Sequence, residues 1–294
     1  MVVGTDSMIG SALARTLRDA GVPCAGTTRR AVRSGQPDVF LDLADPAGAG
    51  TLPRTDVAVL CAGVSKLQDC TRDPAGSRAI NVEGVARLAE TLVHTGAFVV
   101  YLSTNQVFDG TQPRRSAEDA VCPVTEYGRQ KADAEALVGA LGDRAAIVRL
   151  TKVFGETVPL FEQWLRALAN HVPIHPFSDM TMAPVPLETV VAALRLIGDA
   201  ETPGVFQVSG EHDVTYAEAA SVGADMIRAD RGLIQPVSVA SAGVLSEPSP
   251  AYTSLDVERV RRLFGVQPPG VWWTIEQAFR NARGVTGPVT THRQ

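Results

Sequence analysis

The chain begins with Val2-Val3-Gly4-Thr5-Asp6-Ser7-Met8-Ile9-Gly10, a short apolar run that leads into a glycine-containing turn. A helix is predicted to follow, because Ile9, Leu13 and Leu17 are spaced so that they share one helical face. The first turn of a helix offers unpaired N–H groups and a partial positive charge, which suit the pyrophosphate of a dinucleotide. Strand, turn and helix in this order are the context of a dinucleotide-binding site, although paired glycines also occur in tight turns that bind nothing.

A second segment carries residue types suited to proton and hydride transfer. Ser103-Thr104 ends an apolar run, and Tyr127-Gly128-Arg129-Gln130-Lys131 opens a predicted helix. Tyr127 and Lys131 are four residues apart, so they share a helical face and can point into one small volume. The phenol would donate a proton to a carbonyl, and the Lys131 ammonium would lower the pKa of that phenol. The Thr104 hydroxyl would bond the carbonyl oxygen.

Apolar runs alternate with helical patterns over the first half of the chain, which is typical of parallel strands joined by crossover helices. We therefore predict an α/β fold with a Rossmann-like, doubly wound parallel sheet and a smaller C-terminal α/β lobe. Residues 1–150, with 184–209 returning to them, form the predicted dinucleotide-binding domain. Residues 151–183 and 210–283 form the predicted substrate-binding lobe, and 284–294 a flexible tail. The predicted strands are 22–28, 39–41, 57–61, 98–103, 146–150 and 204–209, and the predicted helices are 9–20, 74–95, 125–141, 161–169 and 187–197.

Composition excludes several classes of protein. The 294 residues are 45% hydrophobic with a net charge of −5, and no basic block suggests nucleic-acid binding. No apolar run approaches the roughly 20 residues of a membrane span. The chain enters its first strand at once, so we expect no signal peptide and a cytoplasmic protein. Its cysteines lack metal-site spacing and are expected to be reduced thiols; they are Cys24, Cys61, Cys70 and Cys122.

The motifs resemble those of the extended short-chain dehydrogenases/reductases, and most closely the dTDP-4-dehydrorhamnose reductase group of sugar-nucleotide reductases. The resemblance covers nearly the whole chain. Its marks are Ser103-Thr104-x-x-Val107-Phe108-Asp109-Gly110, Tyr127-Gly128-x-x-Lys131, Arg149-x-x-x-Val153-Phe154-Gly155, Asp179 with Pro184, and Thr253-Ser254-Leu255-Asp256 before Leu263-Phe264-Gly265.

The resemblance implies an NADPH-dependent reductase of a 4-keto nucleotide sugar, with Thr104, Tyr127 and Lys131 as its catalytic residues. It also implies a homodimer through the helices predicted at 74–95 and 125–141, and no metal site. The expected cofactor-binding residues are Gly4, Ser7, Met8, Ile9, Gly10, Arg29, Arg30, Asp42, Leu43, Ala62, Gly63, Ser103, Tyr127 and Lys131. The expected substrate-binding residues are Asn105, Gln106, Val107, Phe108, Lys152 and Asp179.

The cofactor preference depends on Arg29 and Arg30, which follow the second predicted strand. An acidic residue there would bind the ribose 2′-hydroxyl of NAD, whereas arginine accommodates a 2′-phosphate. We therefore expect NADP(H) to be preferred, with NAD(H) possible. An ordinary solvated basic pair is the alternative.

The chain departs from the group pattern at four positions. Ser7 replaces the usual middle glycine of the first turn, and a serine there can still bond phosphate. Asn105 and Gln106 stand where the group has Asp-Tyr, and Lys152 where it has an aromatic residue. The last three should face the substrate, so we expect a preferred substrate other than dTDP-4-dehydro-L-rhamnose; neutral variation at the rim of the pocket is the alternative.

Two other functions remain open from the sequence. One is an epimerase or dehydratase that keeps its NAD bound and consumes no reductant. The other is a non-catalytic, cofactor-binding subunit that regulates a partner enzyme. The Arg29-Arg30 pair opposes the first, and the complete set of Thr104, Tyr127 and Lys131 opposes the second.

Overall fold

The computed structural model describes residues 1–30, 38–45, 52–243 and 249–286. A seven-stranded parallel sheet in the order β10-β6-β5-β4-β1-β2-β3 forms its centre. The strands are β1 Val2–Val3, β2 Gly26–Thr28, β3 Asp38–Phe40, β4 Val57–Leu60, β5 Phe98–Thr104, β6 Ala145–Leu150 and β10 Gly204–Val208. The predicted α/β, doubly wound fold is confirmed.

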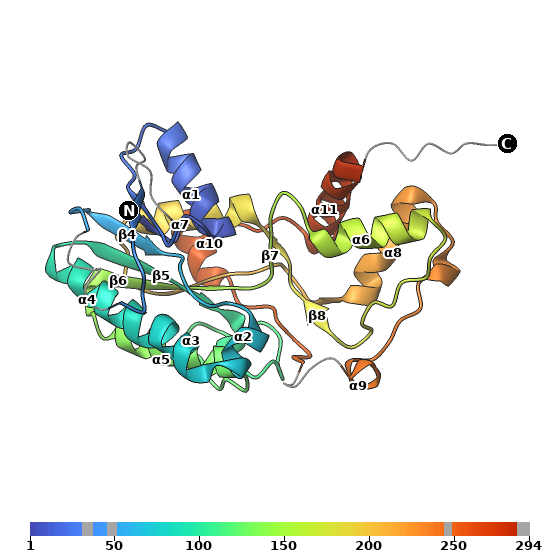
Figure 1. Cartoon of the computed structure of the whole chain (residues 1–294), viewed down its shortest axis with the longest axis horizontal. Coiled ribbons are helices and arrows are strands. Elements are labelled where there is room, and N and C mark those ends of the chain that lie inside the picture. Colours follow the sequence, from blue (N-terminus) through green and yellow to red (C-terminus); the bar gives the residue numbers. More distant parts are fainter. Residues whose placement is uncertain (31–37, 46–51, 244–248, 287–294) are drawn as a thin grey trace.

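Helices cover both faces of this sheet, which is why its central strands are almost continuously apolar. The helices α1 (Met8–Asp19), α7 (Leu187–Asp199) and α10 (Glu258–Phe264) pack on one face, in a core that includes Leu13, Leu194 and Val260. The helices α4 (Val85–His94) and α5 (Glu126–Gly139) pack on the other, where Leu88 and Val138 are buried (Figure 1).

The second lobe has its own hydrophobic core. Helices α6 (Pro159–Ala169), α8 (Tyr216–Ile227) and α11 (Val271–Thr286) gather beside the sheet (Figure 1), and the rings of Phe161 and Phe279 stack with centroids 4.1 Å apart. Two small sheets complete the lobe, β7 (Val153–Phe154) with β9 (Val185–Pro186) and β8 (Thr181–Met182) with β11 (Val214–Thr215). The remaining elements are α2 Leu67–Arg72, α3 Pro74–Arg78, α9 Val239–Ala242 and the short 3-10 turns Asn105–Val107, Gly142–Arg144 and Arg231–Leu233.

Several predicted boundaries were wrong. The strand predicted at 22–28 begins only at Gly26, because Val22 is still bonded to the end of α1 and the paired strand β1 has two residues. The helix predicted at 74–95 is interrupted by a π-helical segment, Ala79–Gly84. There the loop after β3 comes so close that a Cβ on Gly84 would lie 2.1 Å from the Leu43 carbonyl oxygen.

The division of the chain also differs from the prediction at its C-terminal side. Strand β10 returns to the sheet as expected, and it pairs with β6, with Gly204 opposite Ala146. However, α10 packs on the first core, through Val260 and Phe264, although 210–283 was assigned to the lobe. The predicted tail starts inside α11, and 287–294 lie outside the described residues.

Candidate active site

Three cavities lie along the C-terminal edge of the sheet, where the strand order reverses between β1 and β4. This is the place where open α/β sheets bind ligands. The first cavity, of about 220 Å³, and the second, of about 280 Å³, share Ser7 and residues 61–64. The second and the third, of about 490 Å³, share Thr104 and Tyr127. The three cavities therefore form one continuous path.

The turn after β1 is built around two close backbone approaches. Gly4 has φ +89°, and a Cβ on it would lie 2.8 Å from Ala62. A Cβ on Gly10 would lie 2.3 Å from the Gly4 carbonyl oxygen. Ser7 caps α1, because its Oγ accepts from the Gly10 N–H at 3.0 Å and donates to the Gly4 carbonyl at 2.8 Å. The serine hydroxyl is thus used by the turn itself, and the N–H groups at the start of α1 are the donors for an anion.

Arg29 and Arg30 have different surroundings. Arg29 lines the first cavity together with Asp42, Leu43, Ala62 and Gly63. Arg30 is not among the lining residues; its side chain is 80% exposed and its Nε lies 3.2 Å from Asp6 Oδ1.

Asp6 fixes the end of β2, a role that the sequence analysis missed. Its Oδ2 accepts from Thr28 Oγ1 at 2.6 Å and from the Arg29 N–H at 3.2 Å. A short acidic side chain in the glycine turn was the available signal, because it can bond the neighbouring strand end.

Thr104 and Tyr127 stand at the junction of the second and third cavities. Thr104 ends β5, and its Oγ1 accepts from the Gln106 N–H at 3.2 Å. Tyr127 lies in the first turn of α5, which Thr125 caps by accepting from the Gly128 N–H at 3.0 Å. Thr125 Oγ1 also donates to Gln106 Oε1 at 3.1 Å, so the segments carrying the two hydroxyls are bonded to each other.

Lys131 borders the second cavity only. Its Nζ donates to the Leu102 carbonyl at 2.6 Å and lies 4.2 Å from the centroid of the Tyr101 ring. Loss of water around this buried ammonium lowers the pKa of Lys131 to about 8. The same cause, burial, raises the pKa of Tyr127 well above its ordinary value, with a smaller contribution from Cys70. The expected lowering of the Tyr127 pKa by Lys131 is thus not seen in the structure, where burial is the main influence on this phenol.

Asn81 connects the π-helical segment to both sides of this site. It holds the loop after β4, since its Oδ1 accepts from the Val64 N–H at 2.8 Å and its Nδ2 donates to the Val64 carbonyl at 2.9 Å. The same Nδ2 donates to Gln130 Oε1 at 2.9 Å, next to Lys131 in the chain. This buried network fixes one wall of the second cavity to α5.

The second cavity also holds an unsatisfied hydroxyl. Ser103 lines it, and its buried Oγ has no hydrogen-bond partner among the described residues. Buried polar atoms are usually bonded, so a polar group of a bound molecule fits here. The small residues Ala62 and Gly63 also line this cavity and leave room for a flat ring. These features fit a dinucleotide cofactor whose reactive ring occupies the second cavity.

The third cavity contains three of the six predicted substrate residues, namely Asn105, Gln106 and Lys152. Its far wall comes from the lobe and includes Met180, Tyr216 and Thr253. Met180 and Tyr216 were missed because no sequence motif marks them, and Thr253, although it belongs to the motif Thr253-Ser254-Leu255-Asp256, was not assigned to the substrate.

The other three predicted substrate residues lie elsewhere, which corrects the sequence assignment. Val107 and Phe108 are buried in a cluster with Leu255, because the 3-10 turn after Thr104 directs them inward. Asp179 does not line the third cavity; its Oδ1 accepts a hydrogen bond from the Val239 N–H at 2.8 Å.

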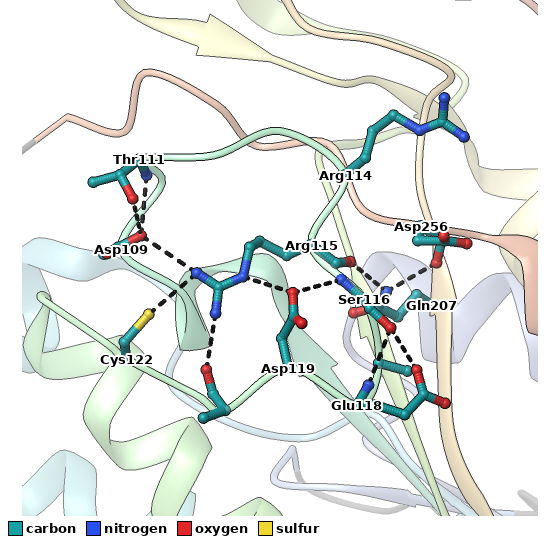
Figure 2. Close-up of polar contacts among 12 residues, drawn as sticks. Asp109, Thr111, Arg114, Arg115, Ser116, Glu118, Asp119, Cys122, Gln207 and Asp256 are labelled. Carbon is teal, nitrogen blue, oxygen red and sulfur yellow. Dashed lines mark hydrogen bonds and ion pairs between the residues drawn. The ribbon is translucent and has the colours of Figure 1, made fainter.

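The loop between β5 and α5 is held by a set of polar contacts, and Figure 2 shows those between Asp109 and Cys122. Arg115 holds it through Asp119 Oδ2 at 2.9 Å and the Ala120 carbonyl at 3.0 Å, and its guanidinium lies over the Phe108 ring. Gln207 Nε2 donates to the Arg115 carbonyl at 2.8 Å, which ties the loop to β10. The loop that carries both hydroxyl-bearing segments is therefore anchored to the sheet.

Two kinds of feature are not found in the described part of the chain. No group of three or more histidine, cysteine or acidic side chains is placed to hold a metal ion there. None of the described helices combines the length and apolar character needed to cross a membrane.

Comparison with known proteins agrees with this geometry. A curated dTDP-4-dehydrorhamnose reductase of Mycobacterium tuberculosis is 30% identical over 261 residues, which cover 83% of this chain and 84% of the relative. The methionine adenosyltransferase 2 subunit beta of Pongo abelii is 27% identical over 220 residues, covering 70% of this chain and 64% of that protein.

A solved structure of dTDP-4-dehydrorhamnose reductase from Bacillus anthracis in complex with NADP has a TM-score of 0.84 at 19% identity. It covers 95% of this chain and 97% of its own. The reductases among these relatives indicate an NAD(P)-dependent oxidoreductase. The model of the RmlD substrate binding domain family matches residues 1–283, and the chain belongs to this family.

Proposed function

We propose that this chain is an NADPH-dependent reductase of a 4-keto nucleotide sugar, in which Tyr127 donates the proton. The observation that carries the proposal is the position of Thr104 and Tyr127, which border both the cavity that fits the cofactor ring and the larger third cavity. A carbonyl held at that junction is within reach of both hydroxyls. The cofactor, when bound, supplies the hydride.

The chain's own residues have distinct tasks in this proposal. Tyr127, neutral because burial raises its pKa, gives its proton to the carbonyl oxygen. Thr104 donates a hydrogen bond to the same oxygen. Lys131 supplies positive charge in the second cavity and, through Leu102, is fixed to β5. Arg29 in the first cavity favours the additional phosphate of NADP(H).

The test is NADPH consumption with a panel of dTDP-, UDP- and GDP-linked 4-keto sugars. Tyr127→Phe should lower kcat by about a hundred- to ten-thousandfold while NADPH affinity stays within a few fold. Tyr252→Phe is the matched control, since Tyr252 is exposed and does not line the third cavity. Stoichiometric consumption of NADPH also separates this function from an epimerase with permanently bound NAD. Full activity of Tyr127→Phe would refute the assignment.

The regulatory alternative is kept because a methionine adenosyltransferase subunit is among the relatives. It predicts NADPH binding without turnover of any 4-keto sugar in the panel.

For the assembly we propose a homodimer through α4 and α5, where Leu137 is 46% exposed. Leu137→Glu should then give a monomer in analytical ultracentrifugation.

A further inference from the structure

The third cavity has a single charged side chain in its described lining, that of Lys152. Its other lining residues are apolar or carry neutral hydroxyl, phenol and amide groups. No described acidic residue forms an ion pair with Lys152. A ligand in this cavity therefore meets one positive charge and no described carboxylate.

The backbone around Lys152 is fixed. Thr151 Oγ1 donates to the Ala183 carbonyl at 2.6 Å, and the Val185 N–H donates to the Lys152 carbonyl at 2.9 Å. The side chain is exposed to the open cavity, although atoms packed around the ammonium remove enough water to lower the pKa of Lys152. A cation that is partly desolvated gains more from an anionic partner than a fully hydrated one does.

The neighbours of Lys152 show where in the cavity this charge lies. Thr151 and Val153 both line the second and third cavities, as Tyr127 does, whereas Lys152 lines only the third. Lys152 therefore lies between two residues of the junction where the carbonyl would react, and its own side chain borders the third cavity. A sugar whose carbonyl is held at that junction brings the substituents next to the reacting carbon close to this ammonium.

We propose that Lys152 selects nucleotide sugars whose sugar ring carries a carboxylate close to the reacting carbon. The inference rests on the proposed function, and it names the substrate class of the same site. The ammonium would pair with the carboxylate, while a neutral hydroxymethyl group at that place would leave the charge unpaired. A charge-assisted contact of this kind changes affinity by about tenfold or more.

Binding can be measured without turnover, by calorimetry in saturating NADP⁺. The probes are UDP-glucuronic acid and UDP-glucose, which differ only in a carboxylate against a hydroxymethyl group, together with the corresponding dTDP-sugars and with UDP and dTDP alone. We expect the carboxylate-bearing sugar to bind at least about tenfold more tightly in one base series. Lys152→Met should remove this advantage and Lys152→Arg should keep it.

Lys66→Met is the matched control, because Ser65 and Leu67 line the third cavity while Lys66 does not. Its preference for the carboxylate should equal that of the unmodified protein. Equal affinity for acidic and neutral sugars would overturn the inference and leave the reductase proposal intact. An equal loss in Lys152→Met for every probe, including UDP or dTDP alone, would overturn it by assigning Lys152 to the diphosphate. If no nucleotide sugar binds, both proposals fail.

Discussion

In a plot of reaction rate against pH, Lys131 should produce a basic limb, a fall in rate with its midpoint near pH 8. Its pKa is lowered to about 8 because burial removes water from the ammonium. The parameter kcat/KM for NADPH reports the free enzyme, in which this value applies. If the charged form is required, kcat/KM should be half its maximum near pH 8 and should fall about tenfold for each further unit.

The limb has a second signature in kcat, which reports the enzyme with ligands bound. The start of α1, where the phosphates of a cofactor would bind, borders the same cavity as Lys131. Their negative charge would favour the charged form of Lys131, so the limb in kcat should lie at a higher pH than the limb in kcat/KM. Lys131→Arg should move both limbs upward, because a guanidinium stays charged throughout this range. Profiles of NADPH consumption between pH 6 and about pH 10 would measure both limbs. A limb that Lys131→Arg leaves in place belongs to another group and refutes the reasoning.

The same group predicts a trend in stability. In the unfolded chain Lys131 keeps its proton up to its ordinary pKa of 10.5, whereas the folded protein releases it near 8. The unfolded state therefore binds more protons between these values, and the contribution of Lys131 to the free energy of unfolding rises with pH in that window. Denaturant titrations should show this rise, and Lys131→Met should lack it.

Three further substitutions follow from the geometry. Gly10→Ala should abolish NADPH binding measured by fluorescence titration, since its Cβ would lie 2.3 Å from a carbonyl oxygen of the first turn; unchanged affinity would contradict the turn's role. Arg29→Ala should lower the preference for NADPH over NADH by about ten- to a hundredfold, whereas Arg30→Ala should change it little; equal effects would contradict the assignment. Glu135→Ala should lower the free energy of unfolding by about 3–5 kcal/mol, because it leaves the buried Arg149 unpaired, and a loss under 1 kcal/mol would contradict this.

The start of the fold could be predicted from sequence because its determinants are local. The spacing of Ile9, Leu13 and Leu17 fixes the buried face of α1, and Gly4 and Gly10 permit the turn before it. The strand at 204–209, with Val205, Phe206 and Val208, could also be predicted, although its pairing with β6 was not part of the prediction. The interruption of the helix at Ala79–Gly84 could not, because it depends on contacts made only after folding, of Asn81 with Val64 and of Gly84 with Leu43.

The candidate site was predictable only in part, for the same reason. Thr104 and Tyr127 reach the junction because each lies at the end of a regular element, where direction is fixed by the strand or helix. Val107 and Phe108 are close to Thr104 in sequence, but a 3-10 turn buries them. Tyr216 and Thr253 reach the third cavity through packing of the lobe, and neither the isolated Tyr216 nor the motif that contains Thr253 indicates which cavity that packing places them in.

In the proposed function, different side chains of this path carry the chemistry and the selectivity. Thr104 and Tyr127 border both of the larger cavities, whereas Asn105, Gln106 and Lys152 border only the third. The departures from the group pattern therefore change what surrounds the sugar without touching the cavity that fits the cofactor ring. Since discrimination depends on buried polar groups finding partners, substitutions at these three positions should change the preferred sugar while Tyr127 and its surroundings stay the same. Substituting Lys152 should accordingly change substrate preference and leave the pH limb of Lys131 where it is.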